Sequence, residues 1–469
     1  MRILEISLFH PELVRGGAQQ AAYELYCGMR DYTGDGGPHT VTLLSSVEPN
    51  IDRALFKPGA IITGMDGRPG EFLYLSDNFE HELFRNQNIR ALKWFETFIV
   101  EQNPDVIHFH HFLTFGLELF LIARRALPNA RLFLTLHEFL AICKADGHMV
   151  RRSDGTLCTH SSHIRCHQCF PDVPPESFKL REDWIKQAFA VFDGFICPTQ
   201  FVKDRYSVWG LNPAKLHVIT NAQQDYAKLG LGALIDVPAP VAPTPTIKAL
   251  RRRPGADAIP PHPETKLPPT RIRNRFGFFG QLVDVKGLGV VFEAVRTLAK
   301  RYDGNISLEI NGTNIKYASE AFRAKFEDFV ANAETEMPNV RVRFNGGYAM
   351  TDLPRRMDRI DWVLVPSTWW EIFGLVLSEA WMFGRPPIAS RIGGLGERVR
   401  HDIDGLLVAP ADPDALADAM ERAMTEEGLW ARLNAASPGV PAVPGIVAQH
   451  LKLFTQPLVS PAILARAAE

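Results

Sequence analysis

Two glutamates stand eight positions apart in the segment 369–380, WWEIFGLVLSEA. The apolar run at 362–366 before them is typical of a buried strand in a parallel sheet, and Gly374 marks a place where a helix can begin. The segment therefore predicts a strand, a loop carrying Glu371 and a helix carrying Glu379, the place where open α/β sheets bind ligands. Along one helix the two carboxylates would lie about 12 Å apart, which suits the two ends of an extended ligand. The N–H groups that open the helix would bind ligand oxygens, and the plain alternative is a helix with two surface glutamates.

A lysine occupies a comparable place in the segment 278–287, FFGQLVDVKG. We expect a strand to end at Phe279 and a helix to begin near Gly287, which puts Lys286 at a helix N-terminus. Its positive charge and the open backbone N–H groups would both favour a phosphate there. An ordinary surface lysine after a strand is the alternative.

In the first half, Gly16 and Gly17 follow the first expected strand and open a helix. Paired glycines let the backbone approach a ligand closely. The segment is not the G-x-G-x-x-G pattern, which argues against a dinucleotide cofactor.

Histidines gather after two further strands, in VIHFHH at 106–111 and at His137. Side chains alternate along a strand, so His108 and His110 share one face. Because the ends of parallel strands point toward the ligand side of the sheet, His110 and His137 are candidate site residues. A structural role in the core is the alternative for both, and a metal site made of histidines alone is a lesser one.

In their order along the chain, these segments resemble the motifs of retaining glycosyltransferases with the GT-B fold, specifically the family-4 or group 1 type. The segment at 371–379 resembles the E-x7-E motif of that family. There the first Glu and the F-G-L backbone hold the donor sugar, and the second Glu holds the nucleotide ribose. The resemblance assigns the donor sugar to Glu371, Phe373, Gly374 and Leu375 and the ribose to Glu379.

The other motifs take donor-side and acceptor-side roles in the same resemblance. Lys286 belongs to a segment similar to the G-R-x-x-x-x-K-G diphosphate site, in which Gln281 stands where the family usually has Arg. The segment 392–397, IGGLGE, is similar to the G-G-x-x-E loop beside sugar and phosphate. The resemblance implies donor contacts for four glycines, Gly16, Gly17, Gly393 and Gly394. It also implies that His110 contacts the donor sugar near its anomeric carbon, whereas His137 would line the acceptor side.

The resemblance implies an α/β protein with two Rossmann-like parallel-sheet domains facing each other across a cleft. It also implies a retaining transfer of the hexosyltransferase type from a UDP- or GDP-sugar to a saccharide or lipid-linked acceptor, with no cofactor or metal needed for the chemistry. Glu371, His110 and Lys286 are the expected catalytic residues. Bacterial polysaccharide or glycolipid assembly is the expected setting. A non-catalytic GT-B module that binds nucleotide or sugar is the alternative, and Gln281 is the residue that favours it.

Length and composition fit this expectation. The 469 residues suffice for two domains, and a net charge of −2 gives no bias toward nucleic acid. No signal peptide or membrane-spanning run stands out, so we expect a cytoplasmic protein. Peripheral contact with the inner membrane is a further hypothesis, through the apolar stretch 112–123 with Arg124 and Arg125.

Apolar runs alternate with amphipathic stretches in both halves, and a proline-rich segment separates them. The expected parts are an acceptor-side domain at 1–225, a linker or insertion at 226–270, a nucleotide-sugar domain at 271–438 and a tail at 439–469 that crosses back to the first domain. The expected strands are 3–7, 40–44, 106–109, 132–136, 194–197, 216–219, 276–279, 305–310, 340–344, 361–365, 386–389 and 405–408. The expected helices are 17–30, 80–102, 114–126, 176–191 and 200–209, with an amphipathic piece at 446–454.

Four of the six cysteines fall within one loop-like segment, 143–169. They are Cys143, Cys158, Cys166 and Cys169, the last two spaced as C-x2-C. Four thiols at this density suit a structural tetrahedral Zn²⁺ site that would shape the acceptor side. Free thiols and an iron–sulfur cluster are the alternatives.

Overall fold

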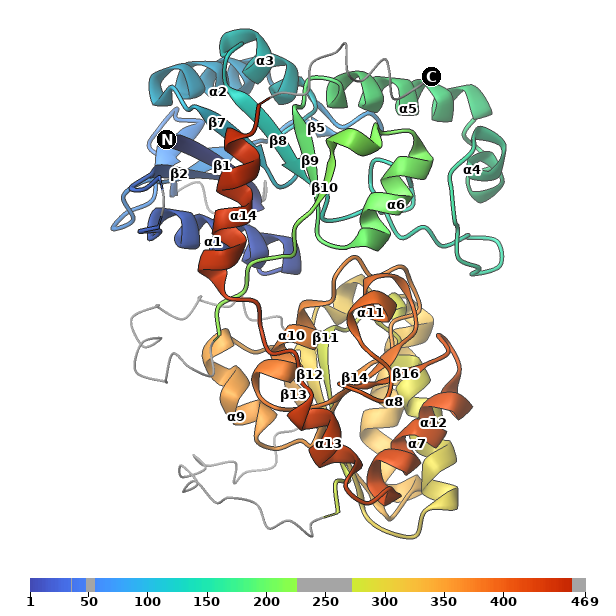
Figure 1. Ribbon diagram of the computed structural model, residues 1–469. Coiled ribbons are helices and arrows are strands. Elements are labelled where there is room, and N and C mark those ends of the chain that lie inside the picture. The colour runs from blue at the N-terminus through green and yellow to red at the C-terminus, as the bar shows by residue number, and fades with distance from the viewer. Residues whose placement is uncertain (35, 48–54, 226–271, 458–469) are drawn as a thin grey trace.

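The computed structural model describes residues 1–34, 36–47, 55–225 and 272–457 of the chain. Two α/β domains, each built on its own parallel sheet, lie one above the other in Figure 1. The expected GT-B architecture of two Rossmann-like parallel-sheet domains is thus confirmed. The proline-rich segment expected to be a linker, 226–270, lies outside the described residues.

The first domain holds an eight-stranded sheet in the order β10-β9-β8-β7-β1-β2-β4-β3, in which every neighbouring pair is parallel except β3 and β4. Its strands are β1 (Arg2–Phe9), β2 (Thr40–Val47), β3 (Ile62–Gly64), β4 (Glu71–Leu75), β7 (Val106–Phe109), β8 (Arg131–Thr135), β9 (Gly194–Cys197) and β10 (Leu216–Val218), and β5 (Phe79–Glu80) and β6 (Arg85–Asn86) form a separate hairpin. Its helices are α1 (Gly17–Arg30), α2 (Ile89–Gln102), α3 (Glu118–Ala126), α4 (His163–Cys169), α5 (Pro175–Phe189) and α6 (Gln200–Trp209), with a short 3₁₀ turn η2 (Pro213–Lys215).

The second domain holds a six-stranded, wholly parallel sheet in the order β13-β12-β11-β14-β15-β16. Its strands are β11 (Arg275–Gln281), β12 (Ile306–Thr313), β13 (Val340–Gly346), β14 (Trp362–Val365), β15 (Pro387–Ser390) and β16 (Leu406–Val408). Its helices are α7 (Leu288–Arg301), α8 (Glu320–Glu336), α9 (Leu353–Met357), α10 (Leu375–Met382), α11 (Gly393–Arg398), α12 (Pro413–Thr425) and α13 (Leu429–Ala435), with 3₁₀ turns η4 (Asp284–Lys286), η5 (Ile315–Tyr317) and η6 (Met350–Asp352). Strands β11 and β14 are neighbours at its centre, so the loops that follow them meet at one edge of the sheet.

The last described helix, α14 (Val443–Thr455), leaves the second domain and packs on the first, beside α1 (Figure 1). Its apolar side joins a buried cluster with Ile3, Leu25 and Phe133. The end of the chain's described part therefore ties the second domain to the first.

The hypothesis of membrane contact assumed that the apolar stretch 112–123 is exposed, and the structure shows that most of its large apolar side chains are buried. Phe112, Phe115 and Phe120 are at most 1% exposed because they fill the core beneath α3, and only Leu121 of this stretch is a large exposed hydrophobic residue. Arg124 donates to the carbonyl of Val191 and to Asp193, inside the domain. None of the described helices is long and apolar enough to cross a membrane.

The local expectations differ from the structure mainly between 60 and 90. The helix expected over 80–102 begins only at Ile89, because Asn88 caps it by accepting from the Ala91 N–H and the residues before it form the β5–β6 hairpin. The stretch expected as helix from 114 begins at Glu118. Strands β3 and β4 and helix α4 were not expected at all.

Candidate active site

Glu371 lies in the loop after β14 and is only 6% exposed. Its Oε1 accepts from Lys286 Nζ at 2.5 Å, Ser367 Oγ at 2.8 Å and Trp369 Nε1 at 2.9 Å. Burial alone would raise the pKa of Glu371, but the charge and hydrogen bond of Lys286 and the two other donors outweigh it, so the pKa is lowered. The carboxylate is thus held ionised and fixed in one orientation.

Lys286 is the last residue of η4, and Gly287 after it is the N-cap of α7. From this position Lys286 reaches Glu371. Gly287 has φ of +75°, and a Cβ there would lie 1.9 Å from the Pro366 carbonyl oxygen, so only glycine lets the loop after β11 approach the loop after β14 this closely. The Lys286 ammonium also lies 4.9 Å from the centre of the Trp369 ring. The two motifs separated by 85 positions in the sequence therefore form one charged pair.

Glu379 lies within α10 and is 7% exposed. Among the described residues nothing hydrogen-bonds its Oε2. Burial, followed by the charge of Glu24 from α1 of the first domain, raises the pKa of Glu379 to about 7. A buried carboxyl oxygen without a partner is costly, so Oε2 suits a ligand that donates hydrogen bonds.

The segment between the two glutamates opens α10 at Gly374, whose φ is +72°. Arg398 of α11 fixes it, because its Nη1 donates to the carbonyls of Phe373 (3.0 Å) and Gly374 (2.9 Å) and its guanidinium lies 3.6 Å from the Phe373 ring centre. Leu375 follows as the first residue of the helix. The expected donor-binding backbone is therefore fixed by a half-buried cation that the sequence interpretation did not identify.

Gly393 and Gly394 pack against the backbone of the same loop. A Cβ on Gly393 would lie 2.4 Å from the Glu371 carbonyl oxygen, which also accepts from the Gly394 N–H at 2.7 Å. A Cβ on Gly394 would lie 2.3 Å from the Ile372 carbonyl oxygen. What the structure shows for these glycines is close backbone packing that positions Glu371.

The first domain meets this loop at several points. Thr199 Oγ1 donates to the Ile372 carbonyl at 2.9 Å, and Glu397 of α11 accepts from the N–H groups of Gln200 (2.9 Å) and Phe201 (2.8 Å) at the start of α6. The side chains of Ile372 and Phe373 belong to the hydrophobic cluster of the first domain. The donor motif therefore lies at the junction of the two domains.

The glycine loop of the first domain faces the same motif. A Cβ on Gly17 would lie 3.5 Å from Leu375 Cδ1 of α10, whereas a Cβ on Gly16 would first meet the side chain of Gln19 in its own turn. Arg15, just before them, donates to the Tyr348 carbonyl of the second domain at 3.4 Å. Gln281, in contrast, is an exposed residue at the end of β11, and none of its described contacts links it to Lys286.

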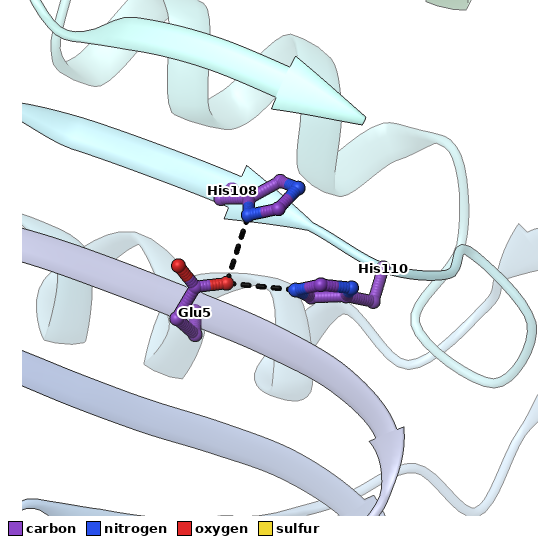
Figure 2. Close-up of side chains that lie close together, drawn as sticks. All are labelled: Glu5, His108 and His110. Carbon is purple, nitrogen blue, oxygen red and sulfur yellow. Dashed lines mark hydrogen bonds and ion pairs between the residues drawn. The ribbon is translucent and has the colours of Figure 1, made fainter. Parts of the chain in front are cut away.

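A buried network organises the histidines, and Figure 2 shows its centre. Glu5 of β1 is 0% exposed, and its Oε2 lies 2.9 Å from His108 Nδ1 and 2.7 Å from His110 Nε2. Burial alone would raise the pKa of Glu5, but the two histidines outweigh it and lower the pKa to about 2. Burial, and then the charge of His108, lowers the pKa of His110 to about 4, so His110 is neutral at pH 7.

These protonation states determine which nitrogen donates. Since Glu5 is ionised, His110 Nε2–H donates to it, and Nδ1 of the neutral ring must accept. That Nδ1 lies 3.0 Å from His137 Nε2, so His137 donates there and keeps Nδ1 as its remaining lone pair. The structure thus connects both expected site histidines through one hydrogen bond and adds Glu5 behind them.

Glu5, His108 and His110 are also the one group of three metal-type ligands whose donor atoms lie within 4.8 Å of one another in the described part of the chain. Their oxygen and nitrogen atoms are already at hydrogen-bond distance, 2.7 and 2.9 Å. A transition-metal ion with bonds of about 2.1 Å would need these atoms to move apart. The group therefore fits the hydrogen bond between His110 and Glu5 better than it fits an ion.

The four cysteines of the segment 143–169 are half-buried free thiols in one region of the first domain. Burial raises the pKa of Cys166 to about 11, and the thiols of Cys143, Cys169 and Cys158 contribute to this rise as near neighbours. No three of the sulfur atoms lie within 4.8 Å of one another in the described structure. The thiols are therefore gathered but not in contact as a ligand set.

With the geometry in view, comparison with known proteins identifies the family. A family model described as Glycosyltransferase Family 4 matches residues 15–222, and one described as Glycosyl transferases group 1 matches residues 266–438. The chain belongs to these group 1, family-4 type glycosyltransferases. The predicted family is thereby confirmed.

Curated relatives resemble parts of the chain, and solved structures share its fold over most of its length. The chain is 36% identical over 152 residues to D-inositol 3-phosphate glycosyltransferase of Corynebacterium urealyticum, a match that covers 32% of this chain and 35% of that protein. It spans about a third of the length of the curated relatives it matches first. The fold is similar to HepE of Anabaena in complex with UDP-glucose, with a TM-score of 0.59, 16% identity and coverage of 97% of this chain and 100% of that one. It is also similar to sucrose-phosphate synthase from Thermosynechococcus elongatus, with a TM-score of 0.61, 16% identity and coverage of 97% and 98%.

Two site residues escaped the sequence interpretation. Glu5 carried a signal, since a charged residue in the apolar strand ILEISLF is an anomaly. Arg398 carried none, because its partners Phe373 and Gly374 lie in a distant segment. Glu397 belongs to the expected loop 392–397, but its contact with the start of α6 was not expected.

Proposed function

We propose that this protein is a retaining glycosyltransferase that moves a sugar from a nucleotide-diphosphate donor to an acceptor hydroxyl. The observation that carries the proposal is the ion pair of half-buried Lys286 with buried Glu371, followed along the same segment by buried Glu379, whose Oε2 has no hydrogen-bond partner among the described residues. Together they offer a cation for a diphosphate, a fixed acceptor for sugar hydroxyls and a free acceptor for a ribose. Because the fold relative HepE was solved in complexes with UDP and UDP-glucose, UDP is the first nucleotide to test.

In the proposed reaction the bond between the anomeric carbon and the diphosphate oxygen breaks, and the acceptor oxygen forms the new bond on the same face. The acceptor proton passes to the departing phosphate oxygen. The ammonium of Lys286, turned from Glu371 toward the diphosphate, and the start of α7 would stabilise the negative charge that develops there. The charge is thus supplied by the protein itself, which is why we propose that the chemistry needs no metal.

His110 and His137 would serve the sugar side of this reaction. Ionised Glu5 fixes which ring nitrogen carries the proton in His110 and, through it, in His137. Nδ1 of His137 therefore keeps a lone pair that can accept a hydrogen bond from a hydroxyl. The acceptor would be a saccharide or a lipid-linked sugar in polysaccharide or glycolipid assembly.

The test is nucleotide binding by calorimetry with UDP, GDP, ADP and CDP. We expect one of them to bind wild type and to bind Lys286→Ala at least 10-fold more weakly, because a desolvated charge-assisted contact is lost. Lys300→Ala is the matched control, since Lys300 is an exposed lysine at the far end of the same helix α7. Equal binding to all three proteins would refute the assignment of Lys286.

The second candidate function is a binding module without catalysis, favoured by Gln281 in place of the usual Arg. Release of free nucleotide from the bound nucleotide sugar separates the two. An enzyme releases it at a rate that increases with a suitable acceptor. A module binds the same donor and leaves it intact.

A further inference from the structure

The segment 143–169 of the first domain supports the donor loop of the second. Trp370, next to Glu371, donates from Nε1 to the Cys158 carbonyl at 2.7 Å. Trp369 makes an edge-on contact with His148, with 5.1 Å between ring centres. The donor loop therefore depends for its position on a segment that contains four cysteines.

That segment has little regular structure of its own. It contains one short bridge between Val150 and Leu157, a hydrogen bond from the Cys158 N–H to the Met149 carbonyl at 2.7 Å, and the seven-residue helix α4. Residues 152–156 at its tip are exposed. A segment with so little regular structure needs a further link between its bridged part and α4 to hold a defined shape.

The cysteines stand where such a link would form. Cys143 and Cys158 come from the two sides of the segment, and both pack partly against the core of the first domain. Cys166 and Cys169 are three residues apart on α4, so their side chains share one helix face. The four thiols are near neighbours of one another.

A second observation points to negative charge at this place. Arg181 of α5 is 5% exposed, and its guanidinium donates only to two backbone carbonyls, those of Ala141 and Leu140, without forming an ion pair to any carboxylate of the described residues. Its charge interacts with the thiol of Cys143, the carboxyl of Glu138 and the thiol of Cys166. Burial raises the pKa of Glu138 to about 7, so this carboxyl compensates the buried cation only in part at neutral pH. Four thiolates around one Zn²⁺ carry a net charge of −2 that would complete the compensation.

We propose that Cys143, Cys158, Cys166 and Cys169 bind one Zn²⁺, and that the ion fixes the segment 143–169 as the support on which Trp370 positions the donor loop. Ligand atoms in a tetrahedral zinc–thiolate site lie about 3.8 Å apart, so binding draws the sulfur atoms together from their described positions. The ion has a structural role, since all four of its positions are taken by sulfur. The second part of the proposal rests on the nucleotide-sugar binding proposed above.

The metal site is tested on the full-length protein without using its activity. We expect about one zinc per chain in metal analysis, and titration of Co²⁺ into zinc-depleted protein should give the intense visible bands of a tetrahedral thiolate site. The double variant Cys166→Ser/Cys169→Ser should lose both, and Cys27→Ser, which removes a half-buried cysteine outside the segment, should retain both. Six freely titrating thiols without bound metal, or the visible spectrum of an iron–sulfur cluster, would overturn the site.

The supporting role is tested by hydrogen exchange and nucleotide binding together. Zinc removal should speed amide exchange in the peptide covering 369–375 and weaken nucleotide binding about 10-fold, the scale of one buried hydrogen bond. Trp370→Phe keeps an aromatic ring at this position and loses the N–H donor, so it should reproduce both effects with zinc still bound. Faster exchange in a protein that binds no nucleotide supports this inference and refutes the proposed function instead. Unchanged exchange after zinc removal would overturn the supporting role.

Discussion

The ionisation of Glu379 should make nucleotide binding depend on pH near neutrality. Burial and the charge of Glu24 raise the pKa of Glu379 to about 7 in the free protein. Under the proposed function, two ribose hydroxyls donate to this carboxyl, and only the ionised form accepts from both. Binding therefore favours the ionised form and lowers the pKa of Glu379 in the complex.

The sign and size follow from this linkage. With a free pKa near 7, about nine-tenths of Glu379 is ionised at pH 8 and about one-tenth at pH 6, so affinity should fall about 10-fold between these values. Each further unit below pH 6 costs another factor of about 10 until the pKa of the complex is reached. Near pH 7, binding should release about half a proton.

Isothermal calorimetry of the bound nucleoside diphosphate at pH 8, 7 and 6 measures both quantities. Titrations in two buffers with different ionisation enthalpies give the proton release directly. Because the terminal phosphate of the ligand titrates near pH 6, Glu379→Gln is the reference, and the ratio of the two affinities isolates the carboxyl. Glu24→Gln should shift the wild-type midpoint to lower pH, since it removes the second cause of the raised pKa. The same pH slope in wild type and Glu379→Gln would refute the reasoning.

Two further variants test the framework of the site. Gly287→Ala should lower the free energy of unfolding by about 2–4 kcal/mol, because the new Cβ would lie 1.9 Å from the Pro366 carbonyl oxygen at a positive φ. Gly289→Ala, which has open space around it in the same helix, should leave the free energy of unfolding equal or higher. Urea unfolding measures both variants, and equal effects would contradict the close approach at Gly287. Glu5→Gln should lower stability at pH 7 by about 2–4 kcal/mol, because the carboxylate that accepts from His110 is ionised in the folded state. A carboxyl whose folded pKa is depressed stabilises the protein above its ordinary pKa of 4.5, so this difference should shrink as pH falls from 4.5 toward 2, and a constant difference would show that the loss is packing alone.

The sequence predicted the strands of the second domain well, because long apolar runs bounded by turns are unambiguous. It missed β4 (Glu71–Leu75), a five-residue strand that pairs in parallel with β2, because so short a run does not distinguish a strand from a loop. It extended α2 backward to 80 because it did not weigh the cap at Asn88. The hydrophobic pattern therefore predicted where most helices and strands lie, whereas capping residues and turns determine where each one begins and ends.

The candidate site was predictable as a set of loops but not as a set of contacts. The positions of Lys286 and Glu371 after strands followed from the pattern, yet their pairing depends on β11 and β14 being neighbours, which strand order alone decides. The link from Trp370 to Cys158 joins residues 212 positions apart and has no local signal. Long-range contacts of this kind follow from tertiary packing, and a single sequence does not contain them in readable form.

The contacts around Glu371 connect the proposed donor loop to the arrangement of the two domains. Thr199 holds the Ile372 carbonyl, and Cys158 holds Trp370, both from the first domain. Lys286 and Gly394 hold Glu371 itself from the second. Under the proposed function, a donor that binds Glu371 and Lys286 in this geometry would favour the joined arrangement of the domains by the same factor that the arrangement favours the donor. The loop around Glu371 is held from both domains, so removing the Thr199 hydroxyl, which bonds the carbonyl next to Glu371, should weaken donor binding.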